Sequence, residues 1–249
     1  WIFDKLPRDY IAVDIACFQA FNFEGITPTS TSRVQVGKPF RKTPVFKSKI
    51  KYIVFNPTWT VPPTILQKDI LPKIKKNPDY LRKMKISVIN RKGRAVDPKS
   101  VNWSKYSKSV PYTLRQEPGP HNALGRMKFI FPNKYFIYLH DTPSRSLFGR
   151  KNRAFSSGCI RVDKEIELAE LLLNDPVKWN RQSILELLET NETLRVNLPK
   201  PKTVMLLYVT VSVDENGNYI FKKDIYERDR PVLEGLNEEF AIWQIRAIK

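Results

Sequence analysis

The stretch YLHDTPSRSLFGRKNRAFSSGCIRV, from Tyr138 to Val162, decides how the whole chain is interpreted. Its third residue is a histidine, His140, and nineteen residues later it holds a cysteine, Cys159. A cysteine attacks a carbonyl carbon as the thiolate, and with an ordinary pKa of about 8.5 it is mostly protonated at neutral pH. A neighbouring imidazole can take that proton or form an ion pair with the sulfur. The stretch therefore predicts a catalytic pair of His140 and Cys159.

The residues beside Cys159 suit the same chemistry. Gly158 has no side chain, which allows a substrate carbonyl to approach the backbone. Main-chain amides around Gly158 and Cys159 could then bind a developing oxyanion, and Arg161 adds positive charge that favours the thiolate. A single cysteine and histidine are nevertheless often unrelated, and cysteine is also a common small core residue. The longer string is more specific than the pair.

The string SSGCIR that follows the histidine is similar to the signature of the YkuD-type L,D-transpeptidases. Three other strings, NPTWTVPP, LRQEPGPHNALGRMKF and YLHDTPSRSLF, resemble the larger YcbB-type members of that family. The resemblance extends from about Tyr10 to Tyr226. It departs from the common pattern at Ser157, where the family often has a histidine, so any auxiliary role of a second imidazole is absent here.

The resemblance implies a mainly β fold with helices, in the α+β class. Residues 8–227 would form a YkuD-like catalytic domain built on a mixed β-sheet or β-sandwich. Prolines punctuate the part from residue 57 to residue 120, which we expect to be an inserted helical capping subdomain, or lid. A plain structural excursion is the alternative, although long irregular insertions are more often functional. Residues 228–249 would form a C-terminal tail that is helical in part.

The resemblance also implies roles for residues around the pair. The backbone carbonyl of Asp141 would orient the second ring nitrogen of His140, and amides near Gly158 would bind the oxyanion. Tyr138 lies two residues before His140 on an alternating strand, so both side chains are expected on one face. The predicted substrate-binding residues are Tyr138, Trp59, Arg161, Ser157 and Asn122. We expect no metal and no cofactor, since no Cys/His spacing suits zinc.

The function that this resemblance implies is formation of 3→3 cross-links in peptidoglycan. Cys159 would capture an acyl group from a tetrapeptide stem as a thioester, release D-alanine, and pass the acyl group to a second stem. Carbapenems would acylate the same thiol. The expected partners are donor and acceptor stem peptides, with other cell-wall synthesis proteins as a further class. The expected location is the periplasm or cell envelope, with any signal or membrane anchor in a segment outside this chain.

Two other classes of function remain open. The same residues could pass the acyl group to water, as in an L,D-carboxypeptidase, an endopeptidase or a cell-wall amidase. The chain could also be a basic, non-catalytic module that binds cell wall or nucleic acid, because it carries 43 basic and 25 acidic residues for a net charge of +18. The basic residues are scattered along the chain and form no recognised reading motif. We therefore expect an anionic wall polymer as partner, and no nucleic acid.

Composition bounds the remaining possibilities. A length of 249 residues suits one domain with an insertion or two small domains. No apolar run approaches the roughly 20 residues of a membrane helix. The two cysteines, Cys17 and Cys159, are expected to be free thiols, because Cys17 lies in an apolar run and Cys159 in a nucleophile-like setting. His121, the other histidine, lies in a loop rich in proline and glycine and is not expected to be catalytic.

Hydrophobic periodicity predicts the secondary structure. Asn216-Gly217 predicts a tight turn between two strands, and Asp163 is expected to cap the helix that follows Cys159. The glycine in NALGRMKF predicts a close approach or a bulge. The expected strands are 10–15, 18–23, 32–37, 49–56, 86–89, 122–131, 135–139, 204–213 and 219–225, and the expected helices are 65–75, 79–85, 164–174, 183–190 and 238–245.

Overall fold

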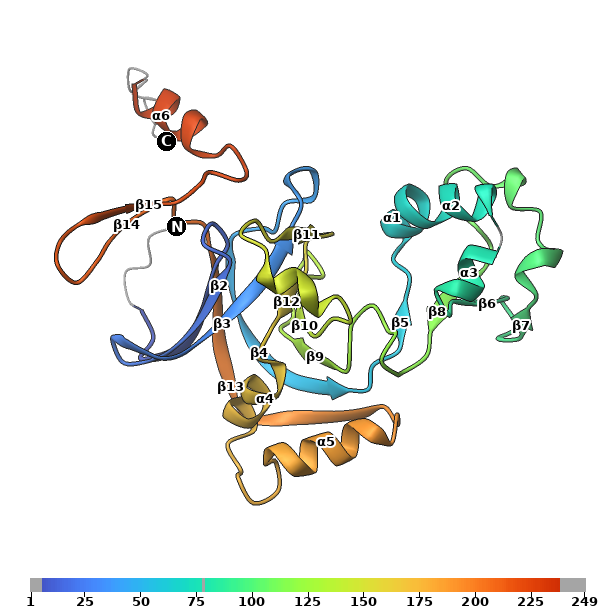
Figure 1. Ribbon diagram of the computed structural model, residues 1–249, viewed down its shortest axis with the longest axis horizontal. Coiled ribbons are helices and arrows are strands. Elements are labelled where there is room, and N and C mark those ends of the chain that lie inside the picture. Colours follow the sequence, from blue (N-terminus) through green and yellow to red (C-terminus); the bar gives the residue numbers. More distant parts are fainter. Residues whose placement is uncertain (1–5, 78, 238–249) are drawn as a thin grey trace, which may run out of the picture.

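The computed structural model describes residues 6–77 and 79–237 (Figure 1). The largest element in this part of the chain is a 9-stranded sheet in the order β11-β3-β12-β10-β9-β4-β13-β1-β2. Its strands are β1 (Asp9–Asp14), β2 (Gln19–Glu24), β3 (Thr27–Gly37), β4 (Phe46–Phe55), β9 (Met127–Ile130), β10 (Leu139–His140), β11 (Ala154–Ser156), β12 (Ile160–Val162) and β13 (Leu194–Leu207).

The sheet closes on itself, because β2 also pairs with β3. β1 runs parallel to β13, β10 to β12, and β11 to β3, whereas the other neighbours are antiparallel. The main hydrophobic core lies against this sheet and takes in Val13, Phe55 and Phe129, which are each 0% exposed. The fold is thus mainly β with a few helices, as the sequence predicts.

Two helices after β12 cover the main core in the lower part of Figure 1. Helix α4 (Glu165–Leu173) buries Ile166, Ala169, Leu172 and Leu173, which share one face of the helix. Helix α5 (Arg181–Glu189) buries Ile184 and Leu188. The side chain of Asn180 accepts a hydrogen bond from the Ser183 amide and caps α5.

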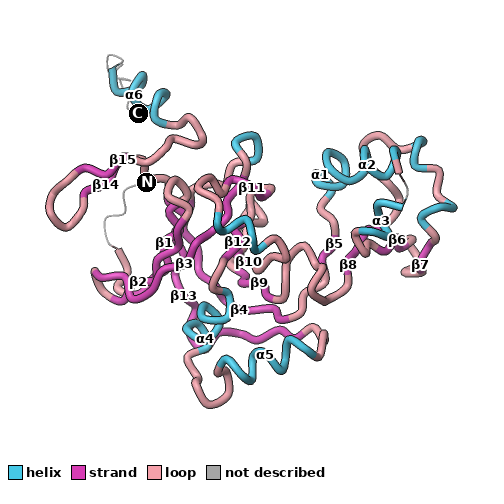
Figure 2. The backbone as a smooth tube through the Cα atoms, viewed as in Figure 1, coloured by secondary structure: helices cyan, strands magenta, loops and turns pink. Residues whose placement is uncertain are grey.

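The residues between β4 and β9 form an insertion with its own sheet and its own core. Its sheet has the order β5-β8-β6-β7, and its apolar cluster includes Ile74, Leu81 and Leu114. β5 and β8 connect it to the body of the molecule (Figures 1 and 2). Its elements are β5 (Trp59–Thr60), α1 (Pro63–Ile65), η2 (Leu66–Ile70, a π-helix), α2 (Leu71–Lys76), α3 (Asp79–Lys83), β6 (Ser87–Ile89), β7 (Ala95–Val96), the 3₁₀ turns η3 (Pro98–Ser100) and η4 (Trp103–Lys105), and β8 (Thr113–Gln116).

The C-terminal part leaves the main sheet after β13. A separate hairpin of β14 (Val211–Val213) and β15 (Tyr219–Phe221) precedes a segment in which Ile225 and Tyr226 are buried. Helix α6 (Asp229–Asn237) follows and buries none of its side chains. Two short 3₁₀ turns, η1 (Pro39–Arg41) and η5 (Arg145–Gly149), complete the described elements.

The structure corrects four predictions of local structure. The expected strand 135–139 begins only at Leu139, because Phe136 has a φ of 56°, which no strand contains. The expected strand 204–213 is divided, since β13 ends at Leu207 in the main sheet and only β14 and β15 pair around the Asn-Gly turn. Asp163 does not cap α4 but forms ion pairs with Arg33 and Arg145. The expected strand 122–131 begins at Met127. The helix expected at 238–245 lies outside the described residues.

Because the insertion has its own core, a cavity in that core should loosen the insertion alone. Leu114 is 1% exposed in β8, and Leu114→Ala removes contacts worth about 2–5 kcal/mol. Hydrogen-exchange mass spectrometry should show faster exchange within residues 59–116 and little change in the main sheet. The matched control is Leu206→Ala, at a residue that is 0% exposed in β13, which should loosen the main sheet. Equal loosening of both sheets by Leu114→Ala would contradict a separate core.

Candidate active site

The pairing of β10 with β12 brings the two ends of the decisive stretch together. In this parallel pair Leu139 lies opposite Ile160 and His140 lies opposite Arg161. Paired residues share a face of the sheet, and side chains alternate along each strand. His140 and Arg161 therefore lie on one face, while Leu139 and Ile160, both 0% exposed, face the hydrophobic core. Tyr138 and Cys159 precede these pairs and continue the polar face, on which the rings of Tyr138 and His140 are 5.6 Å apart.

His140 is a buried, neutral imidazole. Its Nδ1 lies 2.5 Å from the carbonyl oxygen of Asp141. A carbonyl can only accept, so Nδ1 carries the hydrogen and Nε2 keeps its lone pair. Burial and the positive charges of Arg161 and Lys128 lower the pKa of His140 to about 3, although the carbonyls of Asp141 and Leu124 oppose that shift. The ring is therefore uncharged at neutral pH and available as a base.

The Asp141 side chain fixes the loop that carries this carbonyl. Its carboxylate accepts hydrogen bonds from the Arg126 amide at 2.8 Å and from the Arg145 guanidinium at 2.9 Å. Burial raises the pKa of the carboxyl group, and these hydrogen bonds oppose the rise. Gly125 has a φ of +64°, and a Cβ at that position would collide with the Asp141 carboxylate. This is the close approach that the glycine in NALGRMKF predicts.

The Cys159 thiol is half-buried and protonated at neutral pH. It points to the carbonyl oxygen of Phe136 at 3.8 Å. Burial raises the pKa of Cys159, while hydrogen bonding from Tyr138 and the charges of Lys128 and Arg161 counteract the rise. In the described residues no hydrogen bond joins the sulfur to the ring of His140. The structure thus places thiol and imidazole on one face, with Tyr138 in contact with each of them.

Two cations lie beside His140 in the row of register partners that crosses neighbouring strands of the sheet. Lys128 on β9 is the register partner of His140, and Arg161 on β12 is the partner of Gln35 on β3. The Lys128 ammonium lies 4.2 Å from the centre of the Tyr138 ring, and Arg161 donates to the Gln35 side chain at 3.0 Å. Among residues 6–77 and 79–237 neither forms an ion pair with a carboxylate, and Nε of Arg161 is buried without a hydrogen-bond partner. Positive charge therefore dominates around the sulfur.

Hydrogen bonds within the turn stabilise the backbone before Cys159. The Ser156 hydroxyl donates to the Cys159 carbonyl at 2.5 Å and accepts from the Gly158 amide at 3.1 Å. Gly158 has a φ of +119°, which L side chains rarely adopt. Its amide is thus already occupied, whereas the Cys159 amide has no hydrogen-bond partner in the described part of the chain. Of the two amides that the sequence suggests for an oxyanion, only that of Cys159 is free.

A salt bridge joins this turn to the insertion. The Arg41 guanidinium binds both carboxylate oxygens of Asp69 in η2, at 2.5 and 2.9 Å. The same Arg41 donates to the Ser157 hydroxyl at 2.8 Å, so Ser157 is an exposed residue tied to the loop after β3. The insertion is therefore in contact, through one side chain, with the residue two places before Cys159.

Two of the predicted substrate-binding residues have their contacts in and beside the insertion. Asn122 is 1% exposed, and its amide nitrogen donates to the carbonyls of Pro57 and Glu117 at the two ends of the insertion. Its oxygen accepts from the Leu124 amide, so this residue holds the base of the insertion together, and its role in substrate binding stays a prediction. Trp59 pairs with Gln116 and packs against the core of the insertion.

The other residues singled out in the sequence lie either beside Cys159 or in an exposed turn. Tyr138, Arg161 and Ser157 do lie at the turn and the row beside Cys159. His121 is exposed in a turn, as expected for a loop residue. Lys128, Arg41 and Thr43 also lie at the site, and sequence reasoning missed them. Only the register of β9 against β10 distinguishes Lys128 from the many other lysines of this chain.

The described residues contain no group of three or more His, Cys, Asp or Glu side chains placed to hold a metal ion. Cys17 and Cys159 are both free thiols. Burial and the nearby Asp14 raise the pKa of Cys17 to about 12. None of the described helices combines the length and apolar character needed to cross a membrane.

Comparison with known proteins shows the family to which the chain belongs. The family model for the L,D-transpeptidase catalytic domain, YkuD, matches residues 8–178, which is more than half of the chain. The protein therefore belongs to the YkuD family of L,D-transpeptidase catalytic domains. The match ends after α4, so α5, β13 and the C-terminal segment lie beyond it.

One relative and three solved structures illustrate the range of similarity. A Haemophilus influenzae protein, provisionally named an L,D-transpeptidase, is 42% identical over 201 residues, which is 81% of this chain. Those residues span only 40% of that relative's length. The Ldtfm carbamoyl enzyme formed with avibactam aligns over 82% of this chain and 50% of its own, at 10% identity and a TM-score of 0.38.

Two mycobacterial enzymes give similar values. An L,D-transpeptidase of Mycobacterium smegmatis aligns over 80% of this chain and 58% of its own, at 11% identity and a TM-score of 0.37. L,D-transpeptidase 1 of Mycobacterium tuberculosis aligns over 80% and 62%, at 10% identity and a TM-score of 0.29. Scores this low add no argument about the site.

The buried state of His140 predicts a pH dependence of stability. Its pKa is about 3 in the folded protein and about 6.5 when unfolded, so the unfolded chain binds an extra proton between those values. The free energy of unfolding should therefore fall as the pH drops below about 6.5, by up to about 1.4 kcal/mol per pH unit from this group. Denaturant unfolding of His140→Gln should show a free energy of unfolding that changes less with pH than that of the wild type. His121→Gln, in an exposed turn, should keep the pH dependence of the wild type. Identical slopes for wild type and His140→Gln would show that the ring is not desolvated.

Substitution of Gly125 tests the support of the Asp141 carbonyl. Gly125→Ala should destabilise the protein through both its positive φ and the collision with Asp141. Gly25→Ala is the matched control, because Gly25 has a φ of +81° but nothing within 4 Å of an added Cβ. Denaturant titrations should show a clearly larger loss for Gly125→Ala, by about 1 kcal/mol or more for the displaced hydrogen bonds. Equal losses would mean that the carboxylate moves aside without cost.

Proposed function

We propose that this protein is a peptidoglycan L,D-transpeptidase that works through a thioester on Cys159. The observation that supports the proposal is the combination of a protonated thiol, a neutral imidazole with a free Nε2, and an unpaired amide on Cys159 itself. A thiol of raised pKa needs a base, and a buried neutral histidine can act as one. A pre-formed ion pair of thiolate and imidazolium is disfavoured, because burial acts against both charges.

The proposed reaction begins with removal of the thiol proton by Nε2 of His140. Sulfur then attacks the carbonyl carbon between the third and fourth residues of a tetrapeptide stem, and the Cys159 amide stabilises the oxyanion. An oxyanion-hole donor is typically worth about 10²–10³-fold in kcat. The proton passes from His140 to the departing amine, so D-alanine leaves and a thioester remains. The side-chain amine of a neighbouring stem then displaces the sulfur and completes a 3→3 cross-link.

The ring and the sulfur must move together for this step. Catalytic hydrogen bonds are often long in a free enzyme and shorten only with substrate bound. A change in the Cys159 side-chain rotamer is the smallest movement that could close the gap. The excess of positive charge from Lys128 and Arg161 would favour both the thiolate that forms and a donor rich in carboxylates. Such a substrate also implies a periplasmic or cell-envelope location.

Transfer of the acyl group to water remains the second candidate. The same thiol, base and amide would serve a carboxypeptidase, endopeptidase or amidase, so the chemistry up to the thioester is shared. The products differ: cross-linked 3→3 dimers for transfer to an amine, and trimmed tripeptides for transfer to water.

Incubation with purified tetrapeptide muropeptides, followed by mass spectrometry, tests the proposal. Wild type should release D-alanine and form 3→3 dimers, and a carbapenem should add to the protein as one covalent adduct. Cys159→Ala should lose both products and adduct, because no nucleophile remains. Cys17→Ala is the matched control and should retain both, since the Cys17 thiol, with a pKa of about 12, is a poor nucleophile.

Four results would contradict this account. Dimer formation by Cys159→Ala would exclude a thioester on Cys159. A carbapenem adduct on Cys17 would show that Cys17 is the nucleophile instead. Retention of full activity by His140→Gln would exclude the histidine as base. Tripeptide products without dimers would favour the hydrolytic alternative.

A further inference from the structure

Tyr226, which lies beyond the family match, closes the loop that follows β3. It is 1% exposed, and its hydroxyl donates to the Gly37 carbonyl at 2.6 Å and accepts from the Thr43 amide at 3.1 Å. Gly37 and Thr43 are the two ends of the loop that contains η1. One hydroxyl group therefore ties both ends of this loop together, across a separation of more than 180 residues in the chain.

Thr43 connects this loop to the turn before Cys159. Its hydroxyl accepts from the Gly37 amide at 2.9 Å and donates to the Gly158 carbonyl at 2.8 Å. Thr43 is 0% exposed, so no water competes for these bonds. The contact is close, because a Cβ on Gly37 would lie 3.1 Å from the Gly158 Cα. The loop and the turn thus form one packed unit.

The Gly158 carbonyl and the Cys159 amide belong to the same peptide group. A trans peptide group is planar, and its C=O and N–H point in opposite directions. Cis peptide bonds are absent from the described residues, so this geometry applies here. Anchoring the Gly158 oxygen toward Thr43 therefore also fixes the direction in which the free Cys159 N–H points.

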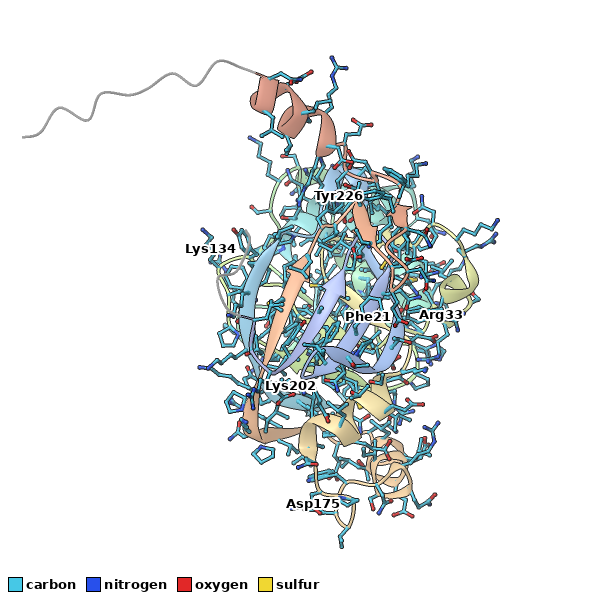
Figure 3. All side chains as sticks on the ribbon, turned by 90° about the vertical axis from the view of Figure 1, so that its left-hand side faces the viewer. Phe21, Arg33, Lys134, Asp175, Lys202 and Tyr226 are labelled. Atoms are coloured by element: carbon cyan, nitrogen blue, oxygen red, sulfur yellow. The ribbon has the colours of Figure 1, made fainter. Side chains whose placement is uncertain are left out.

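Tyr226 is itself held by Tyr208, which lies outside the site, and by Lys42 of the same loop. Its ring stacks on that of Tyr208 at 5.3 Å and an interplanar angle of 9°, and its amide donates to the Tyr208 hydroxyl at 2.8 Å. Its carbonyl accepts from the Lys42 ammonium at 2.5 Å. Figure 3 shows Tyr226 at the end of the sheet from which the C-terminal segment departs. The ring and the backbone of Tyr226 thus have partners of their own besides the two hydrogen bonds of its hydroxyl.

We infer that Tyr226 is a positioning residue for the oxyanion-binding amide of Cys159, and that it acts through Thr43 and the Gly158 carbonyl. The inference rests on the proposed function, because it concerns acylation of Cys159. If Tyr226 only anchored the C-terminal segment, its hydroxyl would affect stability and leave the chemistry at Cys159 unchanged. Loss of a positioning residue should slow acylation of Cys159 but leave its alkylation unchanged, whereas loss of a purely structural anchor should leave both reactions unchanged.

Tyr226→Phe removes the hydroxyl and keeps the stacked ring. Its acylation rate constant with a carbapenem or a tetrapeptide donor should fall by about tenfold or more, since the oxyanion donor is misaligned. Alkylation of Cys159 by iodoacetamide, measured on the Cys159 peptide at the same pH, should stay near the wild-type rate, because alkylation forms no oxyanion. For the donor peptide, kcat should fall with little change in KM.

Thr43 variants test the path. Thr43→Val should reproduce the slow acylation, whereas Thr43→Ser keeps a hydroxyl and should restore most of the rate. The double variant Tyr226→Phe with Thr43→Val should acylate no more slowly than Thr43→Val alone, because both changes act through one carbonyl. Independent, multiplying effects of the two substitutions would contradict the path.

Tyr208→Phe is the matched control. It removes a hydroxyl that the Tyr226 amide and Asp224 both bind, so it loosens the same segment without touching Gly37 or Thr43. It should lower Tm about as much as Tyr226→Phe and keep acylation close to the wild-type rate. An equal loss of acylation in Tyr208→Phe, or a wild-type rate in Tyr226→Phe, would overturn the inference. A wild type that forms no acyl-enzyme at all would instead refute the proposed function.

Discussion

The parallel pairing of β10 with β12 is the constraint on which the site depends. It joins only Leu139 to Ile160 and His140 to Arg161, yet it brings together two segments separated by a long loop. The antiparallel partner β9 adds Lys128 to the same row, and β3 adds Gln35. A shift of this register by one residue would turn the polar row into the core and the apolar row outward. The buried positions of Leu139 and Ile160 make such a shift costly, because both side chains belong to the main core.

The charges in that row decide which protonation states the site can adopt. Burial of the ring, together with two cations that pair with no carboxylate in the described part of the chain, keeps His140 neutral. Burial also keeps Cys159 protonated, although the same cations would stabilise the thiolate once it forms. The arrangement therefore suits a proton transfer during attack rather than a permanent ion pair, and it favours an anionic substrate.

Segments from three other parts of the chain converge on the turn from Ser156 to Cys159. The loop after β3 contributes Thr43 and Arg41, the insertion contributes Asp69 through Arg41, and the C-terminal segment contributes Tyr226 through Thr43. The family match ends at residue 178, before this last segment. A short turn with a positive φ at Gly158 needs such external support, because its own backbone would otherwise adopt other conformations.

The sequence alone determined the local features that depend on residue type and spacing. Alternating apolar residues marked most strands, the Asn-Gly turn marked the hairpin, and the motif around Cys159 indicated the family and its thiol chemistry. Only the tertiary structure decided that Phe136 breaks the strand before Leu139, that Asn122 clasps the insertion, and that the Gly158 amide is occupied while that of Cys159 is free. It also revealed Lys128 and Tyr226, which resemble other lysines and tyrosines until a register or a buried hydrogen bond places them. Periodicity and motifs depend on neighbours along the chain, whereas register, desolvation and hydrogen bonds between distant residues arise only when the chain closes on itself.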